Sequence, residues 1–221
     1  MSLGRKRAGR FLLRRPRVCL LLLIPLFLSG CLSGPDDEPA RRTLQFSELR
    51  FSSPISPADT SATIEAGYYV GPTFCWAIEE INVSLEGRTI RVSGTAVDRS
   101  EGQTCGQALS YGQGSLSLPP LDPGTYLLRA GSLHDTLVVS TEVASSSRRF
   151  VARGDLASDA TGCGDLAAPP FWIGLSDLPD SLPTGEIIVW GEELDEDPCG
   201  RSHPEFYDFF ASVRRVAAAP T

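Results

Sequence analysis

The chain has few of the residues on which most enzymatic chemistry depends. Among its 221 residues are two histidines and one lysine, Lys6. Because no lysine follows residue 6, Schiff bases and Ser-x-x-Lys nucleophiles are excluded from the rest of the chain. The chain also has no Gly-x-Ser-x-Gly, phosphate-loop or His-Glu-x-x-His sequence. These absences predict a protein that is not an enzyme, with no catalytic residue and no cofactor.

The residues that could bind a metal are widely spaced. Zinc sites use C-x₂₋₄-C pairs or nearby histidines, whereas the cysteines from Cys75 onward are 30, 58 and 36 residues apart. His134 and His203 each stand alone, so we expect neither to act as a base or a ligand. The acidic run Glu192–Asp197 lacks the glycine and the spaced ligands of an EF-hand. We therefore predict no metal site, and a solvated loop over residues 192–197.

Positive charge is scarce after the N-terminus. The net charge of the chain is −7, and residues 1–30 hold seven cationic residues and no acidic ones. The rest has 13 arginines against 27 acidic residues, a net charge of −14. An acidic body repels other polyanions, so we expect no nucleic acid partner.

The first thirty residues have the pattern of an export signal. The cations end at Arg17, and an apolar run interrupted by Pro25 follows over residues 18–28. The run is about half of the ~20 residues that span a bilayer, which favours a removable signal peptide. The sequence Leu28-Ser29-Gly30-Cys31 then resembles the lipobox of bacterial lipoproteins.

The lipobox resemblance implies that residues 1–30 are removed and that Cys31 carries a diacylglycerol thioether. Each buried methylene contributes about 0.8 kcal/mol, so two or three acyl chains anchor a protein stably. No Asp follows Cys31, which in this family is compatible with an outer membrane where the cell has one. We expect a cell-envelope protein on the exported side of the membrane. Residues 31–43, rich in Pro, Gly and acids, are expected to form a disordered tether.

Four cysteines follow Cys31, namely Cys75, Cys105, Cys163 and Cys199. An exported protein lies in an oxidising compartment, where an even number of cysteines predicts disulfides. Three pairings are possible. We favour Cys75–Cys105 with Cys163–Cys199, because each bridge then stays within one half of the chain.

Residues 44–144 alternate apolar and polar side chains with the period of strands. The clearest case is a hairpin in which residues 81–85 and 90–92 flank a Glu86-Gly87 turn. Other strands are expected over residues 44–51, 62–70, 115–118, 125–130 and 136–140. Short strands at this spacing predict a β-sandwich. The Pro-Gly-x-Tyr turn that ends at Tyr126 resembles the tyrosine corner of immunoglobulin-like domains.

A polar break at residues 145–149 precedes the last part of the chain. Strands are expected over residues 150–154, 171–175 and 186–191. Residues 204–217 fit both a strand and a helix. A closing strand there would complete a small β-barrel over residues 148–218, which resembles the OB-like or SH3-like modules of exported proteins. The predicted fold class is therefore all-β, an immunoglobulin-like sandwich followed by that barrel.

Together these features predict a membrane-anchored lipoprotein that binds or scaffolds an envelope protein or a polysaccharide without catalysis. One alternative is a glycan-binding module, since exposed aromatic side chains stack on sugars. The candidates for that role are Tyr68, Tyr69, Phe74, Trp76, Phe171 and Trp172. The other alternative is an envelope hydrolase, which requires a cleft with two carboxylates and a shifted pKa.

Overall fold

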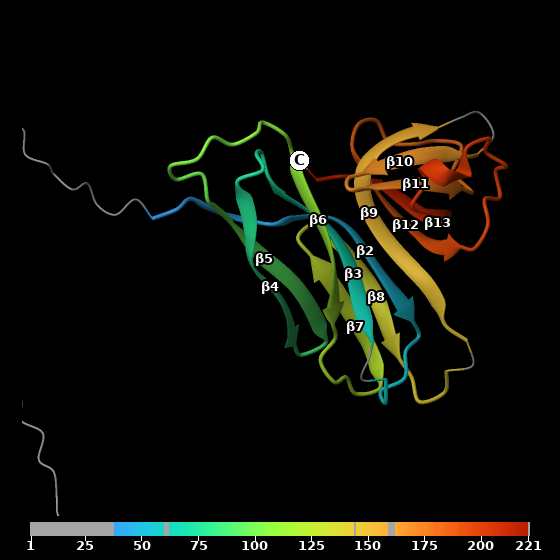
Figure 1. Ribbon diagram of the computed structural model, residues 1–221. Helices are drawn as coiled ribbons and strands as arrows, with labels where there is room; N and C mark the ends of the chain where they lie inside the picture. The colour runs from blue at the N-terminus through green and yellow to red at the C-terminus, as the bar shows by residue number, and fades with distance from the viewer. Residues whose placement is uncertain (1–37, 60–61, 144, 159–161, 221) are drawn as a thin grey trace, which may run out of the picture. The chain divides into compact units, whose positions relative to one another are not determined.

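The computed structural model describes residues 38–59, 62–143, 145–158 and 162–220 (Figure 1). Residues 38–221 form one compact unit. Its regular elements are strands and one short 3₁₀ turn, so the all-β prediction is confirmed. No helix within the described ranges has the length and hydrophobicity to cross a bilayer. The predicted signal peptide and Cys31 lie outside the described residues.

The first sheet is built around β5 (Thr89–Asp98). β4 (Trp76–Glu86) pairs with β5 antiparallel, and the two strands form the predicted hairpin. On its other side β5 pairs parallel with β7 (Gly124–Ala130), which continues antiparallel into β8 (Leu133–Val139). The sequence analysis placed the last of these strands at residues 136–140, whereas the strand begins three residues earlier and includes Leu133, His134 and Asp135.

A short strand, β1 (Arg41–Thr43), also pairs with β5. The sequence placed these residues in the tether, because three residues are too few to show a hydrophobic period. Backbone pairing and an ion pair hold them instead, with Arg41 Nε 2.9 Å from Glu79 Oε2. The sheet therefore includes the last three residues of the expected tether.

The turn before β7 has the geometry that the tyrosine corner implies. The ring of Tyr126 is buried, and its hydroxyl donates a 2.8 Å hydrogen bond to the backbone oxygen of Asp122. Gly124 in this turn has a φ of 146°, and a Cβ there would collide with the guanidinium of Arg88. Side chains other than glycine rarely adopt this φ, so the backbone conformation favours glycine where β7 begins.

The second sheet has eight strands in the order β10-β11-β13-β12-β9-β2-β3-β6. Their bounds are β2 Gln45–Ser53, β3 Thr63–Gly71, β6 Ser110–Ser117, β9 Ser147–Ser158, β10 Gly164–Ala168, β11 Phe171–Ser176, β12 Ile187–Leu194 and β13 Phe209–Ala218. The half that contains β2, β3 and β6 packs on the first sheet around a common hydrophobic core. This is the sandwich half of the molecule, drawn from blue to yellow-green in Figure 1.

The other half of the second sheet closes on itself. β9 pairs with β10 as well as with β12, which joins β9, β10, β11, β13 and β12 into a small five-stranded barrel. β11 and β13 are parallel, and the other neighbours are antiparallel. Of the two barrel types expected, this Greek-key order agrees with the OB-like one. The C-terminal segment is a strand, preceded by the 3₁₀ turn Pro204–Phe206 (η1), and the helical alternative is wrong.

Two strands, β9 and β12, serve both halves, and we call them the shared strands. Along β12, Ile187 and Val189 belong to the barrel core, whereas Ile188 and Trp190 belong to the sandwich core. β9 alternates in the same way. Because both faces are buried, β12 begins with an unbroken apolar run rather than an alternating one. The polar break at residues 145–149 thus leads straight into a strand that both cores use.

β9 changes its pairing partner along its length (Figure 1). It pairs with β2 as far as Ala152 and with β10 from Asp155 onward. Gly154 lies between these two stretches, where a Cβ would meet the backbone carbonyl of Ala167. The close approach of two backbones at Gly154 lets β9 bend from the sandwich into the barrel.

Both expected disulfides are present, in the pairing that the sequence favoured. Cys75 and Cys105 join the open end of the β4–β5 hairpin to the loop after β5, with Cα atoms 5.6 Å apart. Cys163 and Cys199 join the start of β10 to the loop after β12, with Cα atoms 6.3 Å apart. One bridge therefore lies in each half of the molecule.

Candidate functional site

A cleft of about 610 Å³ lies at the junction of the barrel and the sandwich half. Its residues come from β2, β3, β6, β9 and β10 and from the connections beside them. They are Leu44, Gln45, Phe46, Ser47, Tyr69, Leu109, Tyr111, Gly131, Ser132, Arg153, Gly154, Asp155, Ala167, Pro169 and Glu186. No histidine or cysteine is among these described lining residues, so imidazole and thiol chemistry are not offered there.

Three side chains of the cleft stand in one row across the sheet. Gln45 of β2 is directly opposite Tyr69 of β3, which is directly opposite Tyr111 of β6. Residues that pair in this way project on the same face. The centroids of the two rings are 5.5 Å apart, with an angle of 52° between the ring planes. Tyr111 is 38% exposed and Gln45 is exposed, so the two ends of the row present an aromatic ring and an amide to solvent, with Tyr69 between them.

Tyr69 is held by further contacts beside the cleft. The guanidinium carbon of Arg42 is 4.4 Å from the centroid of the Tyr69 ring and 5.6 Å from that of Trp76. The Trp76 ring in turn packs so closely on Gly71 that a Cβ there would overlap it. These cation–π and packing contacts fix the rings before any ligand arrives.

The polar groups of the cleft come from the other side of β2. Arg153 of β9 donates through Nη2 to Glu186 Oε2 at 2.6 Å and through Nη1 to Ser132 Oγ at 3.4 Å. The guanidinium is thus oriented while its side chain stays 30% exposed. Asp155, two residues further along β9, is exposed and also lines the cleft. The site combines one cation, two carboxylates and an amide with an aromatic row.

A hydrogen bond between two lining residues joins the two halves at the cleft. Ser47 Oγ donates a 2.6 Å hydrogen bond to the backbone oxygen of Pro169, in the turn between β10 and β11. Nearby, a Cβ at Gly67 would collide with the ring of Phe171. The barrel therefore sits closely on β2 and β3, and the cleft is a preformed feature of the unit.

A buried carboxyl, Glu48 on β2, lies outside the cleft lining. It is 1% exposed, and neither of its oxygens accepts a hydrogen bond from any described residue. Arg50 Nε is 3.0 Å from Oε1, a charge contact without hydrogen-bond geometry. Burial raises the pKa of Glu48 to about 8, against the lowering effect of Arg50 and with smaller raising effects from Asp208, Glu193 and Glu65.

The charged groups next to Glu48 form a network that links the sandwich to the barrel. Arg50 contacts Glu65 at 2.9 Å and Glu193 at 3.9 Å, and Arg148 contacts the same two carboxylates at 2.6 and 3.1 Å. The guanidinium of Arg50 also lies over the rings of Phe171 and Phe209. With Glu48 protonated, the two arginines balance the charge of the two carboxylates, and the network is neutral. Ionisation of Glu48 adds a negative charge that no arginine of the network balances.

The residues that the sequence singled out for chemistry are not brought together. The ring of His134 lies 5.7 Å from that of Trp190, and His203 contacts Glu205 on the surface at 3.1 Å. The acidic run is not simply a solvated loop, because Glu192 and Glu193 lie in β12 and Glu193 pairs with arginines. Among the described residues, no cluster of three His, Cys, Asp or Glu side chains is arranged to hold a metal ion.

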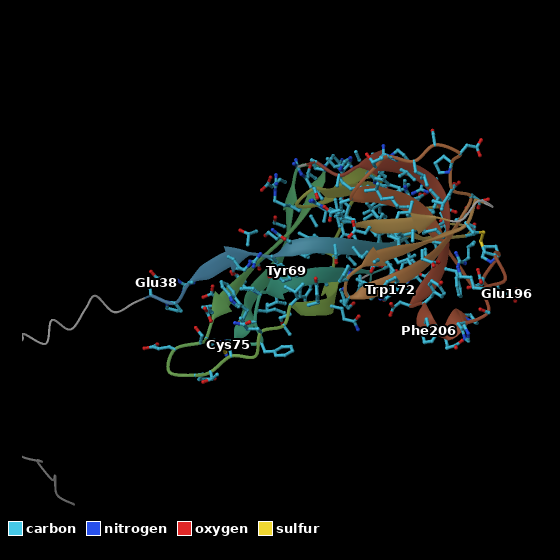
Figure 2. All side chains as sticks on the ribbon, turned by 90° about the horizontal axis from the view of Figure 1, so that it is seen from above. Glu38, Tyr69, Cys75, Trp172, Glu196 and Phe206 are labelled. Carbon is cyan, nitrogen blue, oxygen red and sulfur yellow. A yellow bond between two sulfur atoms is a disulfide. The ribbon has the colours of Figure 1, made fainter. Side chains whose placement is uncertain are left out.

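The candidate aromatic residues divide between the core and the surface. Tyr68 and Phe171 are buried, Tyr69 and Trp76 are partly buried, and Phe74 is exposed. Trp172 at the start of β11 is 54% exposed, close in the fold to η1, since Asp208 N–H donates to its backbone oxygen at 2.8 Å. Figure 2 shows Tyr69 over the sandwich strands, with Trp172 and Phe206 on the barrel. Sequence reasoning included Tyr69 but missed Tyr111, Gln45 and Arg153.

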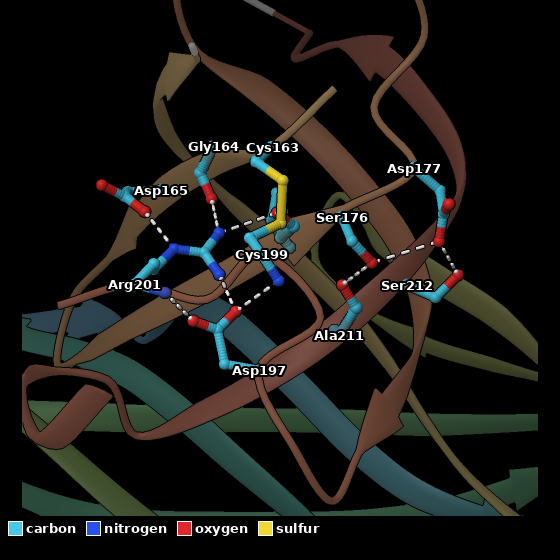
Figure 3. The surroundings of a disulfide bond; sticks show 11 residues. Cys163, Gly164, Asp165, Ser176, Asp177, Asp197, Cys199, Arg201, Ala211 and Ser212 are labelled. Atoms are coloured by element: carbon cyan, nitrogen blue, oxygen red, sulfur yellow. Dashed lines mark hydrogen bonds and ion pairs between the residues drawn. A yellow bond between two sulfur atoms is a disulfide. The ribbon is translucent and has the colours of Figure 1, made fainter. Parts of the chain in front are cut away.

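Beside the Cys163–Cys199 bridge, Arg201 connects the loop after β12 to the barrel (Figure 3). It donates to the backbone oxygens of Gly164 and Leu175 at 2.9 and 2.8 Å and to Asp165 at 3.2 Å. It also pairs with the carboxylate of Asp197. Burial alone would raise the pKa of Asp197, but hydrogen bonds from the Arg201 and Cys199 backbone N–H groups and the guanidinium lower it.

No protein-family model matches the chain, and neither the curated proteins nor the solved structures include a significant match.

Proposed function

We propose that the protein is a lipid-anchored, exported binding module of the cell envelope that performs no catalysis. The observation that carries this proposal is the preformed cleft between the barrel and the sandwich. Clefts of a few hundred to about 1,000 Å³ with a few convergent polar groups are typical ligand sites. The cleft at Tyr69 and Tyr111 has that size and that composition.

The export part of the proposal is supported by the lipobox-like sequence and by the two disulfides. Replacing Cys31 by serine is expected to release the protein from the membrane, because the thioether and its acyl chains are lost. The measurement is fractionation of cells into membrane and soluble parts, with the intact mass of the purified protein. An unmodified mass for the unchanged protein, or a membrane fraction unaffected by C31S, would contradict the anchor.

The binding part of the proposal is tested by crosslinking from inside the cleft. A photoreactive amino acid at Leu109, which lines the cleft and is 59% exposed, is expected to capture an envelope component in cells. Amine-directed crosslinkers are unsuitable, because no lysine follows Lys6. The matched control places the same group at Leu127, which is 41% exposed on β7. Equal products from both positions, or none from Leu109, would contradict binding in the cleft.

A glycan ligand is the second candidate function, and the exposure of Trp172 favours it. Trp172 presents a half-exposed indole on the surface of the barrel. It would give a sugar a flat apolar surface on which to stack. A ligand bound at Trp172 would change the tryptophan fluorescence, and a Trp172→Phe variant identifies that signal.

A further inference from the structure

We infer that the ligand of the cleft is a neutral oligosaccharide, stacked on Tyr111 and hydrogen-bonded by Arg153 and Gln45. This inference rests on the proposed binding function and gives its ligand a chemical class. It also places the sugar at a tyrosine row that only the strand register assembles, and of that row the sequence had suggested only Tyr69.

The aromatic row has the features that a sugar ring requires. A pyranose presents a face of C–H groups, which packs on a flat aromatic ring, and tyrosine supplies such a surface at little cost in side-chain entropy. Tyr111 is the exposed member of the row at 38%, and Tyr69 lies 5.5 Å behind it between ring centroids. Arg42, stacked 4.4 Å from the Tyr69 centroid, supports the row from within the protein.

The polar groups match the remaining faces of a sugar. Hydroxyl groups both donate and accept, so a site for them needs planar side chains that offer donors and acceptors together. Gln45 offers both from its place in the tyrosine row. Arg153 offers donors and is already oriented by Glu186 at 2.6 Å, while Asp155 offers acceptors on the same strand.

The charge of the site selects a neutral ligand. The cleft lining contains two carboxylates, Asp155 and Glu186, and one guanidinium, Arg153, which pairs with Glu186. The chain after residue 30 carries a net charge of −14. An anionic polymer such as a polyuronate would meet repulsion both at a distance and in the site. An uncharged chain of sugars has no such penalty, and the open cleft leaves room for more than one ring.

The test uses the full chain in detergent and calorimetry with four trisaccharides: maltotriose, cellotriose, triacetylchitotriose and the anionic trigalacturonate. We expect at least one neutral probe to bind and trigalacturonate not to bind. Tyr111→Ala and Arg153→Gln are each expected to weaken that binding about tenfold, whereas Tyr111→Phe retains the ring and stays within about twofold. Melting curves of all variants establish that each is folded.

Phe206→Ala is the matched control, since Phe206 is an aromatic residue that is 69% exposed and lies outside the cleft lining, and its loss is expected to leave the affinity unchanged. Trp172→Ala tests the second candidate site. Loss of binding in W172A but not in Y111A would overturn the inference and place the sugar on the barrel. Binding of trigalacturonate, or of no probe, would also overturn it. If the photoreactive group at Leu109 captured a protein and none of the sugars bound, this inference would be wrong, but the proposed binding function would stand.

Discussion

Replacing Glu48 by glutamine is expected to stabilise the protein increasingly as the pH rises from about 4.5 to 8. Burial holds the pKa of this carboxyl near 8 in the folded protein, whereas its ordinary value is 4.5. Between these values the unfolded chain releases the proton and the folded chain keeps it. The stability from this group is therefore complete below pH 4.5 and is lost as the pH rises through about 8.

The magnitude follows from the difference between the two pKa values. Each unit of pH within that window costs about 1.4 kcal/mol, so the loss at pH 7 is about 3 kcal/mol. Glutamine has nearly the same shape and no proton to lose. Urea unfolding at several pH values is the measurement, and the difference between E48Q and the unchanged protein should grow by about 3 kcal/mol from pH 4.5 to 7.

Glu101 provides the control for Glu48, since it is exposed in the loop after β5 and is not among the groups that act on the pKa of Glu48. Glu101→Gln removes one surface carboxyl without changing the surroundings of Glu48, so this variant is expected to keep the stability loss of about 3 kcal/mol between pH 4.5 and 7. If the stability curves of E48Q and the unchanged protein ran parallel over this pH range, burial would not govern the proton of Glu48.

Arg201→Ala is the second substitution with a large expected effect. The Arg201 side chain is 13% exposed, and it pairs with Asp197 and Asp165 while donating to two backbone oxygens. Its loss leaves the mostly buried Asp197 without a cation and the Gly164 and Leu175 carbonyls without this donor. Breaking such a pair costs about 2–4 kcal/mol of unfolding free energy, after a discount for partial exposure. Urea unfolding without reductant measures it while both disulfides stay intact.

Arg201→Lys is expected to recover only part of this loss, because lysine lacks the planar fork that reaches several acceptors at once. Arg91→Ala is the surface control, since Arg91 pairs with Glu86 where both side chains are exposed. It is expected to change the unfolding free energy by less than about 1 kcal/mol. If R201A also lowered the unfolding free energy by less than about 1 kcal/mol, the disulfide alone would hold the loop after β12.

Much of the strand content was predictable, because most strands have one wet face and one buried face. The β4–β5 hairpin and the Tyr126 turn carry their patterns within a few residues. β10 was missed because it is five residues long with one large apolar side chain, Leu166, and its pairing depends on β9 and β11. The secondary structure of the C-terminal segment was ambiguous in the sequence, because its apolar residues fit both the spacing of a helix and the spacing of a strand.

The candidate site was much less predictable than the fold. Gln45, Tyr69 and Tyr111 are far apart in the sequence and meet only through the register of three strands. Glu48 looks in the sequence like an ordinary surface acid on an alternating strand. A shift in the β2–β3 register between Phe46 and Glu48 accompanies its burial. Both the tyrosine row and the burial of Glu48 depend on how distant strands pair, so no local sequence pattern predicts them.

The shared strands bear on how this protein tolerates truncation. β9 lies beside β2 and fills part of the sandwich core through Val151. A chain that stopped before Ser147 would leave β2 with unpaired backbone N–H and C=O groups along an open border of the sheet. Such a border is a template for strands of other molecules, so the sandwich half made alone is expected to self-associate into aggregates rather than remain a soluble fragment.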